Sequence, residues 1–592
     1  MEKITQPHLK IKKYVFVYIL AIILVLLRQI ITGIGPLILN ILVDGAILGQ
    51  EVKSGYIKSF LSFFLKIEKG FYSIIILSTI ILIFYFIGSF MTYLSGILNA
   101  IATENIINKL RLRLHESIQR FTYAHYMKEE TGDLLQRCTS NLNTIKNTFS
   151  QFIISGIGII FSIFYVFAIM LSQNIKMTIF SSCAIPVIFI SSVIFMIYIK
   201  KQYEIVNKKE ALMIQVAQEN LTGVRVVKAF SMQEYEMKKF EKVAKDYRDI
   251  VKKVVKVESI FWALCDGVTL AQIMFVTLYG SYLAYLGEIT VGQVFSFGQY
   301  ITALIFPIRQ LARIISNFGR LSISIKRIKE VLNAPKENIK ETDTINTLKG
   351  DLSFNHVSFS YPSSKEHKVL TDVSFKIKEG EMLGIIGMTG SGKTSLMYLL
   401  ERLYSCDTGN ITIDNVDIAN IDLFTLRKHI GIVLQEPFLY SKTIKENIKL
   451  SNPEATDEQV IEVAKEACLH KDIMEFENGY DTIVGENGVT LSGGQKQRLA
   501  IARTLLKNAS IIIFDDSLSS VDTTTDAQIR ESINKIRGDK ILIVISHRLS
   551  SVLNADKIIV LEDGKISQEG RHEELLNQEG LYKRIYEIQN AI

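Results

Sequence analysis

Long runs of apolar residues dominate the first half of the chain. They cover residues 14–48, 71–99, 148–172, 177–199, 259–286 and 293–318. Because about 20 apolar residues in a helix cross the hydrocarbon core of a bilayer, each run is long enough to span a membrane. The pattern therefore predicts six membrane-spanning helices. The first run is longer than a perpendicular span needs, so we expect this helix to tilt or to project beyond the lipid.

The polar segments between the runs predict the orientation of the chain. Residues 100–147 and 200–258 are rich in Lys and Arg and carry apolar residues at helical spacing, which predicts continuous helical extensions of the spans. Lysines also precede the first run. Since positive charge favours the cytoplasmic side, we expect the N-terminus and both long segments to be cytoplasmic. The lysines of residues 49–70, on the expected outer side, are an exception.

The pattern changes near Asp351, where short alternating strands and turns begin. The preceding residues are charged and poor in aromatic side chains, which is typical of a linker. We therefore expect an α-helical membrane domain with six helices over residues 1–321, a linker over 322–349 and an α/β phosphate-loop domain over 350–592.

Composition agrees with a membrane half joined to a soluble half. The 592 residues are 48% hydrophobic yet 21% charged, and the net charge of +7 needs no nucleic acid as a partner. The five cysteines are scattered, with no CxxC pair, so neither a disulfide framework nor a zinc site is indicated. Abundant Ile and Lys with only eight Pro indicate an AT-rich bacterial genome, so we expect a multi-pass protein of a bacterial plasma membrane.

The clearest chemical motif is GIIGMTGSGKT, residues 384–394, which follows an apolar strand and precedes a helix. This is the G-x-x-x-x-G-K-T phosphate loop in the context that it requires. Its backbone N–H groups can surround phosphate oxygens, Lys393 supplies charge, and the Thr394 hydroxyl can ligate Mg²⁺. The predicted nucleotide contacts are Gly387, Met388, Thr389, Gly390, Ser391, Gly392, Lys393, Thr394 and Ser395.

A second motif is IIIFDD, residues 511–516, in which an apolar strand runs into two carboxylates. Asp515 would belong to the Mg²⁺ shell. This signal is weak by itself and becomes strong beside the phosphate loop.

Between these motifs lies LSGGQ, residues 491–495. With it, the chain resembles the ATP-binding cassette (ABC) transporter family over nearly its whole length. In that family the signature contacts ATP held by the opposite subunit, which implies this role for Ser492, Gly493, Gly494 and Gln495. Two glycines and a serine ahead of a helix also suit an anion-binding helix terminus. The resemblance implies ATP and Mg²⁺ as cofactors and a dimer of half-transporters that couples ATP hydrolysis to transport.

Three further positions match family elements. Tyr361, in FSYP, corresponds to the aromatic residue that stacks on adenine. Gln435 corresponds to the glutamine that senses Mg²⁺ and contacts the membrane domain, and His547 to the switch histidine that touches the γ-phosphate. The resemblance thus implies catalytic roles for Asp516, His547 and Gln435, and metal-binding roles for Thr394, Gln435 and Asp515.

Looser matches favour the exporter subtype of the family. Asp522 resembles the loop that crosses to the partner domain, and residues 482–488 resemble the segment through which exporters contact the membrane domain. Residues 131–135 and 219–230 resemble the first and second cytoplasmic coupling regions.

Asp516 departs from the family, in which glutamate at this position polarises the attacking water. A carboxylate one methylene shorter would hold that water poorly. One interpretation is a tolerated substitution with slow turnover. The other, typical of heterodimeric exporters with one degenerate ATP site, pairs this chain with a half-transporter that carries the glutamate. A homodimer stays possible because His547 is retained.

The transported cargo is open at this point. Arg28, Asp266, Arg309 and Arg313 lie within the predicted spans, where ionisable residues are functional candidates. Arg28 and Asp266 are expected at similar depth, as a structural ion pair or as the lining of a polar cavity. We expect export of a drug, lipid or peptide. The alternatives are an importer on the same fold, as for siderophores, and an ATP-gated channel or regulatory subunit; six spans exclude a soluble ABC protein acting on nucleic acid.

Overall fold

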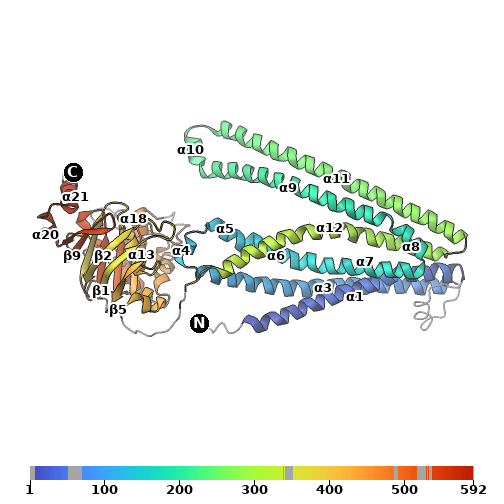
Figure 1. Cartoon of the computed structure of the whole chain (residues 1–592), viewed down its shortest axis with the longest axis horizontal. Coiled ribbons are helices and arrows are strands. Elements are labelled where there is room, and N and C mark those ends of the chain that lie inside the picture. Colours follow the sequence, from blue (N-terminus) through green and yellow to red (C-terminus); the bar gives the residue numbers. More distant parts are fainter. Residues whose placement is uncertain are drawn as a thin grey trace. The chain divides into compact units, whose positions relative to one another are not determined.

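The computed structural model describes residues 7–50, 70–337, 339, 348, 351–485, 491–516, 528–529, 531 and 537–590. The chain divides into two units (Figure 1). The helical unit comprises residues 1–119 and 130–334, and the sheet unit comprises residues 120–129 and 335–592.

Thirteen described helical segments build the helical unit. Their bounds are α1 Pro7–Ile41, η1 Leu42–Ile47, α3 Phe71–Gln119, α5 Thr131–Gln136, η2 Arg137–Asn141, α6 Leu142–Asn147, η3 Thr148–Ile153, α7 Ile154–Gln173, α8 Ile175–Ser182, α9 Ala184–Thr222, α10 Val224–Ala229, α11 Gln233–Tyr285 and α12 Val291–Asn333. Within the described residues, six stretches are long and apolar enough to cross a membrane. The six predicted membrane helices are confirmed.

The cytoplasmic extensions differ from the expectation in one respect. Each long polar segment was predicted as a continuous helical extension, but the chain reverses in both. Residues 120–130 separate α3 from α5, and the short helix α10 joins α9 to α11 (Figure 1). Helical spacing of apolar residues continues on both sides of each reversal, so periodicity alone did not locate the turns. Helix α12 runs to Asn333, so residues 322–333, assigned to the linker from sequence, are helical.

Close helix contacts in the helical unit depend on glycine. A Cβ at Gly33 would overlap the Tyr165 ring of α7, and one at Gly158 would lie 2.8 Å from Val25 of α1. Small residues let helix backbones approach closely inside a membrane, where lipid removes the usual hydrophobic driving force. The buried Tyr300 hydroxyl of α12 donates to the Gly33 carbonyl at 2.9 Å, which joins α12 to α1 at the same place.

The sheet unit contains two β-sheets. Its strands are β1 Leu352–Phe359, β2 Leu370–Ile377, β3 Met382–Gly387, β4 Thr408–Ile413, β5 Val416–Asp417, β6 Ile430–Val433, β7 Ile511–Asp515, β8 Ile541–Ile545, β9 Lys557–Glu562 and β10 Lys565–Gly570. Strands β2-β1-β4-β5 form an antiparallel sheet. The second sheet has the order β10-β9-β3-β8-β7-β6, with β10 antiparallel and the other pairs parallel.

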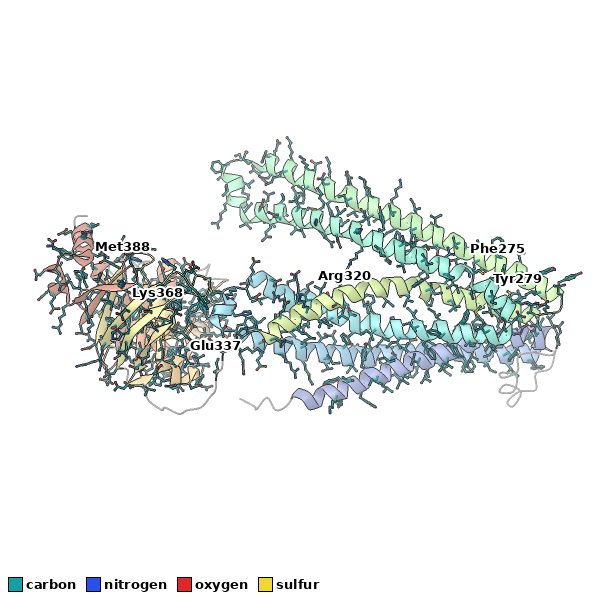
Figure 2. All side chains as sticks on the ribbon, viewed as in Figure 1. Phe275, Tyr279, Arg320, Glu337, Lys368 and Met388 are labelled. Atoms are coloured by element: carbon teal, nitrogen blue, oxygen red, sulfur yellow. The ribbon has the colours of Figure 1, made fainter. Side chains whose placement is uncertain are left out.

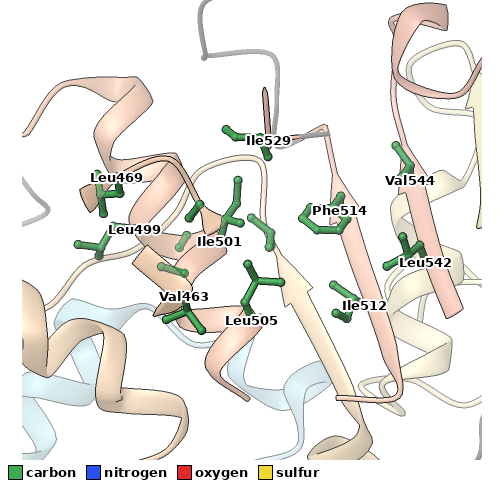
Figure 3. Packing of buried hydrophobic residues seen from close by; sticks show 14 of the residues in the cluster. Val463, Leu469, Leu499, Ile501, Leu505, Ile512, Phe514, Ile529, Leu542 and Val544 are labelled. Atoms are coloured by element: carbon green, nitrogen blue, oxygen red, sulfur yellow. The ribbon is translucent and has the colours of Figure 1, made fainter. Parts of the chain in front are cut away.

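Helices cover these sheets. Those that bear on the site are α4 Tyr123–Tyr126, α13 Lys393–Leu400, α16 Asp457–Glu466, α18 Gly493–Leu506 and α21 Leu581–Asn590. The central strands β7 and β8 are buried throughout, as expected for parallel strands covered on both faces. Figure 3 shows Ile501 and Leu505 of α18 on the side toward Ile512 and Phe514 of β7, in one buried cluster. This core holds α18 and the carboxyl end of β7 in fixed relation.

Candidate nucleotide-binding site

Four adjacent parallel strands bring the predicted site residues to one edge of the sheet. The phosphate loop follows β3, His547 follows β8, Asp515 ends β7 and Gln435 lies just after β6. In open α/β sheets, ligands bind outside the carboxyl ends of such strands. Motifs that lie up to 160 residues apart in the sequence therefore meet because β3, β8, β7 and β6 are neighbours.

The phosphate loop is a tight turn that glycine makes possible. Gly390 and Gly392 have φ of +85° and +100°, a region that L side chains rarely adopt. A Cβ at Gly392 would also lie 2.7 Å from Leu370 and 3.0 Å from the Val369 carbonyl oxygen. Lys393 Nζ donates to the carbonyl oxygens of Gly387 and Met388 at 2.8 and 2.9 Å. The ammonium group is therefore held over the loop.

Buried charges of both signs gather at this edge. Burial lowers the pKa of Lys393, and Asp515 and Asp516 oppose that shift. Burial also raises the pKa of Asp515, and Asp516 raises it further, against the effect of Lys393, His547 and a hydrogen bond from Thr394. Burial and the neighbouring Asp516 thus destabilise the ionised form of Asp515, an effect that a bound divalent cation would relieve.

Asp516 has a left-handed backbone conformation. Its φ is +43°, and its N–H donates to the Ile545 carbonyl oxygen of β8 at 2.9 Å. Aspartate is one of the few non-glycine residues that adopt this region readily, because its short polar side chain can hydrogen-bond locally. The backbone at this position therefore accommodates aspartate well.

The LSGGQ segment forms the N-terminus of α18. Ser492 accepts a hydrogen bond from the Gln495 N–H, and the Gln495 side chain accepts one from the Ser492 N–H, which is a complete capping box. Gln495 also donates to Asp472 at 3.0 Å. Gly493 and Gly494 occupy the first turn of this helix, and a Cβ at Gly493 would meet nothing within 4 Å. The first turn of α18 is thus rigid, with open space at Gly493.

Tyr361, the residue expected to stack on adenine, belongs to a cluster of tyrosines whose other members the sequence analysis missed. The Tyr361 hydroxyl is 2.8 Å from the Ser395 hydroxyl, and its ring stands edge-on to Tyr404 with centroids 5.3 Å apart. Tyr404 and Tyr398 both pack against Tyr123 of α4, at 5.6 and 5.5 Å. Only the return of residues 120–129 to the sheet unit reveals this cluster, because nothing in the local pattern links Tyr123 to residue 361.

His547 and Gln435 are exposed, and each is anchored through its surroundings. The Gln589 side chain of α21 donates to the His547 carbonyl oxygen at 2.7 Å and accepts from the Leu549 N–H at 2.9 Å. The buried Gln497 side chain of α18 donates to the carbonyl oxygen of Leu434, next to Gln435, at 3.1 Å. Sequence reasoning missed both glutamines, since neither lies in a recognised motif.

Some predicted positions lie outside the described residues: Asp522 and residues 486–488 of the 482–488 segment. The side chain of Arg313 is likewise not described.

Of the two alternatives left open for Arg28 and Asp266, the ion pair between them is wrong. Asp266 of α11 pairs with Arg309 of α12 at 2.6 Å, and Arg309 also donates to the Cys265 carbonyl oxygen at 2.8 Å. Arg28 instead lines a cavity of about 670 Å³ among α1, α3, α7 and α12. Similar depth along two helices did not imply contact, because α1 packs on α3, α7 and α12 and not on the face of α11 that carries Asp266.

The residues at the sheet edge fit a nucleotide with a divalent cation. The Ser391 hydroxyl lies in the phosphate loop and is buried without a hydrogen-bond partner among the described residues. Among the described residues, no three His, Cys, Asp or Glu side chains gather as a metal site. A bound Mg²⁺ would therefore draw on Thr394, Asp515 and oxygens of the nucleotide, a donor set that this hard cation prefers.

Comparison with known proteins agrees with this geometry. Family models match the ABC transporter transmembrane region at residues 18–308 and the ABC transporter at residues 370–519. The uncharacterized ABC transporter ATP-binding protein YknU of Bacillus subtilis is 31% identical over 97% of this chain and 95% of its own length.

The chain belongs to the ABC transporter family. It is an ATPase coupled to transport and a multi-pass protein of the bacterial plasma membrane. The leukotoxin export ATP-binding protein LtxB of Aggregatibacter actinomycetemcomitans is 31% identical over 98% of this chain and 79% of its own length. The structure of a bacterial Atm1-family ABC exporter with ATP bound superimposes with a TM-score of 0.78 at 24% identity, covering 97% of this chain and 99% of that one, which shows a shared fold.

Proposed function

We propose that this chain is one half of a heterodimeric ABC exporter and that its own phosphate loop forms a slow ATP site. ATP binding would close the nucleotide-binding domains, and hydrolysis would reset them. The observation that carries the proposal is Asp516, an aspartate at the position from which the attacking water is polarised.

Named residues would hold ATP and Mg²⁺ in this site. Tyr361 would stack on the adenine, the loop from Gly387 to Ser395 would bind the phosphates, and Thr394, Asp515 and Gln435 would ligate or sense Mg²⁺. His547 would contact the γ-phosphate. Ser492, Gly493, Gly494 and Gln495 would serve the other site of the dimer, on the partner's ATP.

The backbone conformation of Asp516 supports the proposal. Its left-handed φ of +43° suits aspartate better than glutamate. The shorter side chain holds its carboxylate about one methylene further from the nucleotide than glutamate would. Since a positioned general base contributes roughly 10²–10⁴-fold to a rate, this displacement is expected to slow hydrolysis substantially.

The hairpin of α9, α10 and α11 supports an assembly with a second half-transporter. Its tip exposes the apolar side chains Leu221, Val224, Val226 and Phe230. Figure 2 shows side chains projecting outward along this hairpin. Contiguous exposed apolar residues mark interaction surfaces. In the resemblance noted above, this region couples the membrane helices to a nucleotide-binding domain, and we assign it to the partner's.

The test is the ATPase rate of the full chain purified alone in lipid, beside Asp516→Glu and Asp516→Asn. We expect a rate close to background for the wild type and a rise of about tenfold or more for Asp516→Glu. Lys393→Ala is the control that removes nucleotide-dependent activity from the same site. A brisk wild-type rate that Asp516→Asn abolishes would instead mean a working homodimer with Asp516 as the base.

The partner can be sought independently. A tagged chain expressed from its own host should co-purify with a second half-transporter that carries glutamate after the strand-terminal aspartate. Recovery of a homodimer alone would contradict the heterodimer.

A further inference from the structure

Two arginines within the membrane helices have opposite surroundings. The Arg309 side chain is 11% exposed and donates to Asp266, to the Cys265 carbonyl oxygen and to the Thr269 hydroxyl. Arg28, near the middle of the first span, has no ion-pair partner within the described part of the chain. An unpaired cation at membrane depth is costly, so such residues are retained where they contact water or a ligand.

The cavity around Arg28 is polar but contains no counter-charge. Arg28 is the single charged residue among those that line it. The other polar lining residues carry uncharged hydroxyl or amide groups, among them Gln29, Asn99, Gln299 and Gln310. A carboxylate in this lining would neutralise Arg28, and the described lining contains none.

The residues that line the cavity fix the position of Arg28 but do not neutralise its charge. A Cβ at Gly88 of α3 would lie 3.9 Å from Arg28 Cγ, so the arginine stem packs beside α3. Close by, the Ser95 hydroxyl donates to the Ala21 carbonyl oxygen at 2.9 Å, and Asn99 donates to the Ser150 carbonyl oxygen at 2.7 Å. These bonds join α1, α3 and η3, so the cavity is built by the fold.

Size and a neighbouring cavity indicate an amphiphilic ligand. The volume of about 670 Å³ lies in the usual range for small-molecule sites. A second cavity of about 710 Å³, between α11 and α12, shares Gln299 and Thr302 with the first. Its lining is mainly apolar, with Ile273, Val294 and Phe295 among its residues. The polar cavity, which contains a single cation, therefore adjoins the apolar cavity at Gln299 and Thr302.

We propose that the Arg28 cavity binds the anionic headgroup of an amphiphilic cargo, such as a phosphate- or carboxylate-bearing lipid. The guanidinium group would supply charge-assisted hydrogen bonds to the anionic oxygens, and the amides would complete them. This inference rests on the proposed transport function, for which it names the class of cargo.

The test is equilibrium binding of dioctanoyl phosphatidylglycerol to the full-length protein in neutral detergent, by calorimetry. We expect Arg28→Gln to weaken binding about ten- to a hundredfold, the usual effect of losing charged hydrogen bonds, and Arg28→Lys to weaken it less. Lys176→Gln, which removes a cation from the exposed pair with Glu288, should leave binding unchanged. Equal binding by wild type and Arg28→Gln would overturn the proposal.

A matched pair of variants tests charge without altering Arg28. Gly96 lines the cavity, and a Cβ there would meet nothing within 4 Å. Gly96→Asp would place a carboxylate in the cavity and should abolish phosphatidylglycerol binding, whereas the equally sized Gly96→Asn should retain it. An equal loss in both variants would contradict a role for charge, even if Arg28→Gln fails to fold.

Two further measurements complete the test. One distinguishes the possible sources of the anion, and the other separates this proposal from the proposed transport function. Inorganic phosphate should compete only weakly, and phosphate binding as tight as that of phosphatidylglycerol would overturn an amphiphilic cargo. ATPase activity is measured in parallel. Arg28-dependent binding without any ATPase activity, alone or with a partner, would leave the headgroup site standing and remove the proposed function. ATPase activity with binding independent of Arg28 would do the reverse.

Discussion

The two units of this protein place charged side chains in opposite kinds of surroundings. In the sheet unit, Lys393, Asp515 and Asp516 are concentrated at one sheet edge, where burial lowers the pKa of Lys393 and raises that of Asp515. In the helical unit, Arg309 is paired across two helices while Arg28 faces a cavity without a counter-ion. A charged group surrounded by other charged groups suits chemistry on a charged ligand. A single charged group surrounded by neutral groups suits the recognition of a charged ligand.

The largest expected effect tests the charged edge. Asp515→Asn should lower Mg²⁺-dependent ATP hydrolysis by about a hundredfold or more, because a ligand to the proposed cation is lost. It should also raise the thermal unfolding midpoint of the nucleotide-free protein. The raised pKa means that the folded state holds ionised Asp515 less readily than the unfolded chain does, which costs stability at neutral pH.

The gain in stability expected for Asp515→Asn depends on pH. The gain from Asp515→Asn should be complete at neutral pH and should shrink as the pH falls through the raised pKa of Asp515, since the wild-type carboxyl is then protonated as well. Asp563→Asn is the control, because Asp563 is an exposed aspartate that also has a positive φ, of +47°. A lower unfolding midpoint for Asp515→Asn would contradict the account of burial.

The next effect concerns packing in the helical unit. A Cβ at Gly292, at the start of α12, would lie 2.5 Å from the Asn40 carbonyl oxygen and 2.8 Å from Asp44 Cγ, and the Gly292 N–H donates to Asp44 at 2.8 Å. Gly292→Ala should therefore destabilise this unit by about 1–3 kcal/mol. Thermal unfolding in detergent measures it. Gly298→Ala, where a Cβ meets nothing within 4 Å, should be close to neutral.

A smaller effect sharpens the contrast between the two arginines. Arg309→Gln should cost about 1–2 kcal/mol, because its charged hydrogen bonds to α11 are lost while the mostly exposed Asp266 can be solvated. Arg28→Gln should leave the unfolding midpoint unchanged or slightly higher. If both substitutions destabilise the protein equally, Arg28 is structural and the contrast fails.

The smallest effect tests how the sheet edge is supported. Gln589→Ala removes two hydrogen bonds from α21 to the His547 segment, so we expect ATPase activity of the assembled transporter to fall by a few-fold. Thermal stability should change by less than about 1 kcal/mol. Gln578→Ala, an exposed glutamine outside α21, serves as the control. Unchanged activity in Gln589→Ala would show that His547 needs no support from α21.

Sequence alone predicted much of the architecture. Six membrane helices and an α/β nucleotide domain followed from run length and motif context, and both are confirmed. The reversals at residues 120–130 and 223–232 did not follow, because the apolar spacing is the same on both sides. The roles assigned to Asp516, His547 and Gln435 stay predictions, although the strands that carry them do converge at one edge.

What the sequence determined by itself is local: long apolar runs make membrane helices, and glycines before Lys393 make a turn that few other sequences could form. Only the tertiary structure decided which side chains contact one another. Tyr123 joins Tyr361 through Tyr404, Arg309 takes Asp266, and Arg28 is left facing a cavity. The physical reason is that spacing along a chain fixes which face a side chain occupies, whereas its partner depends on which helices pack together.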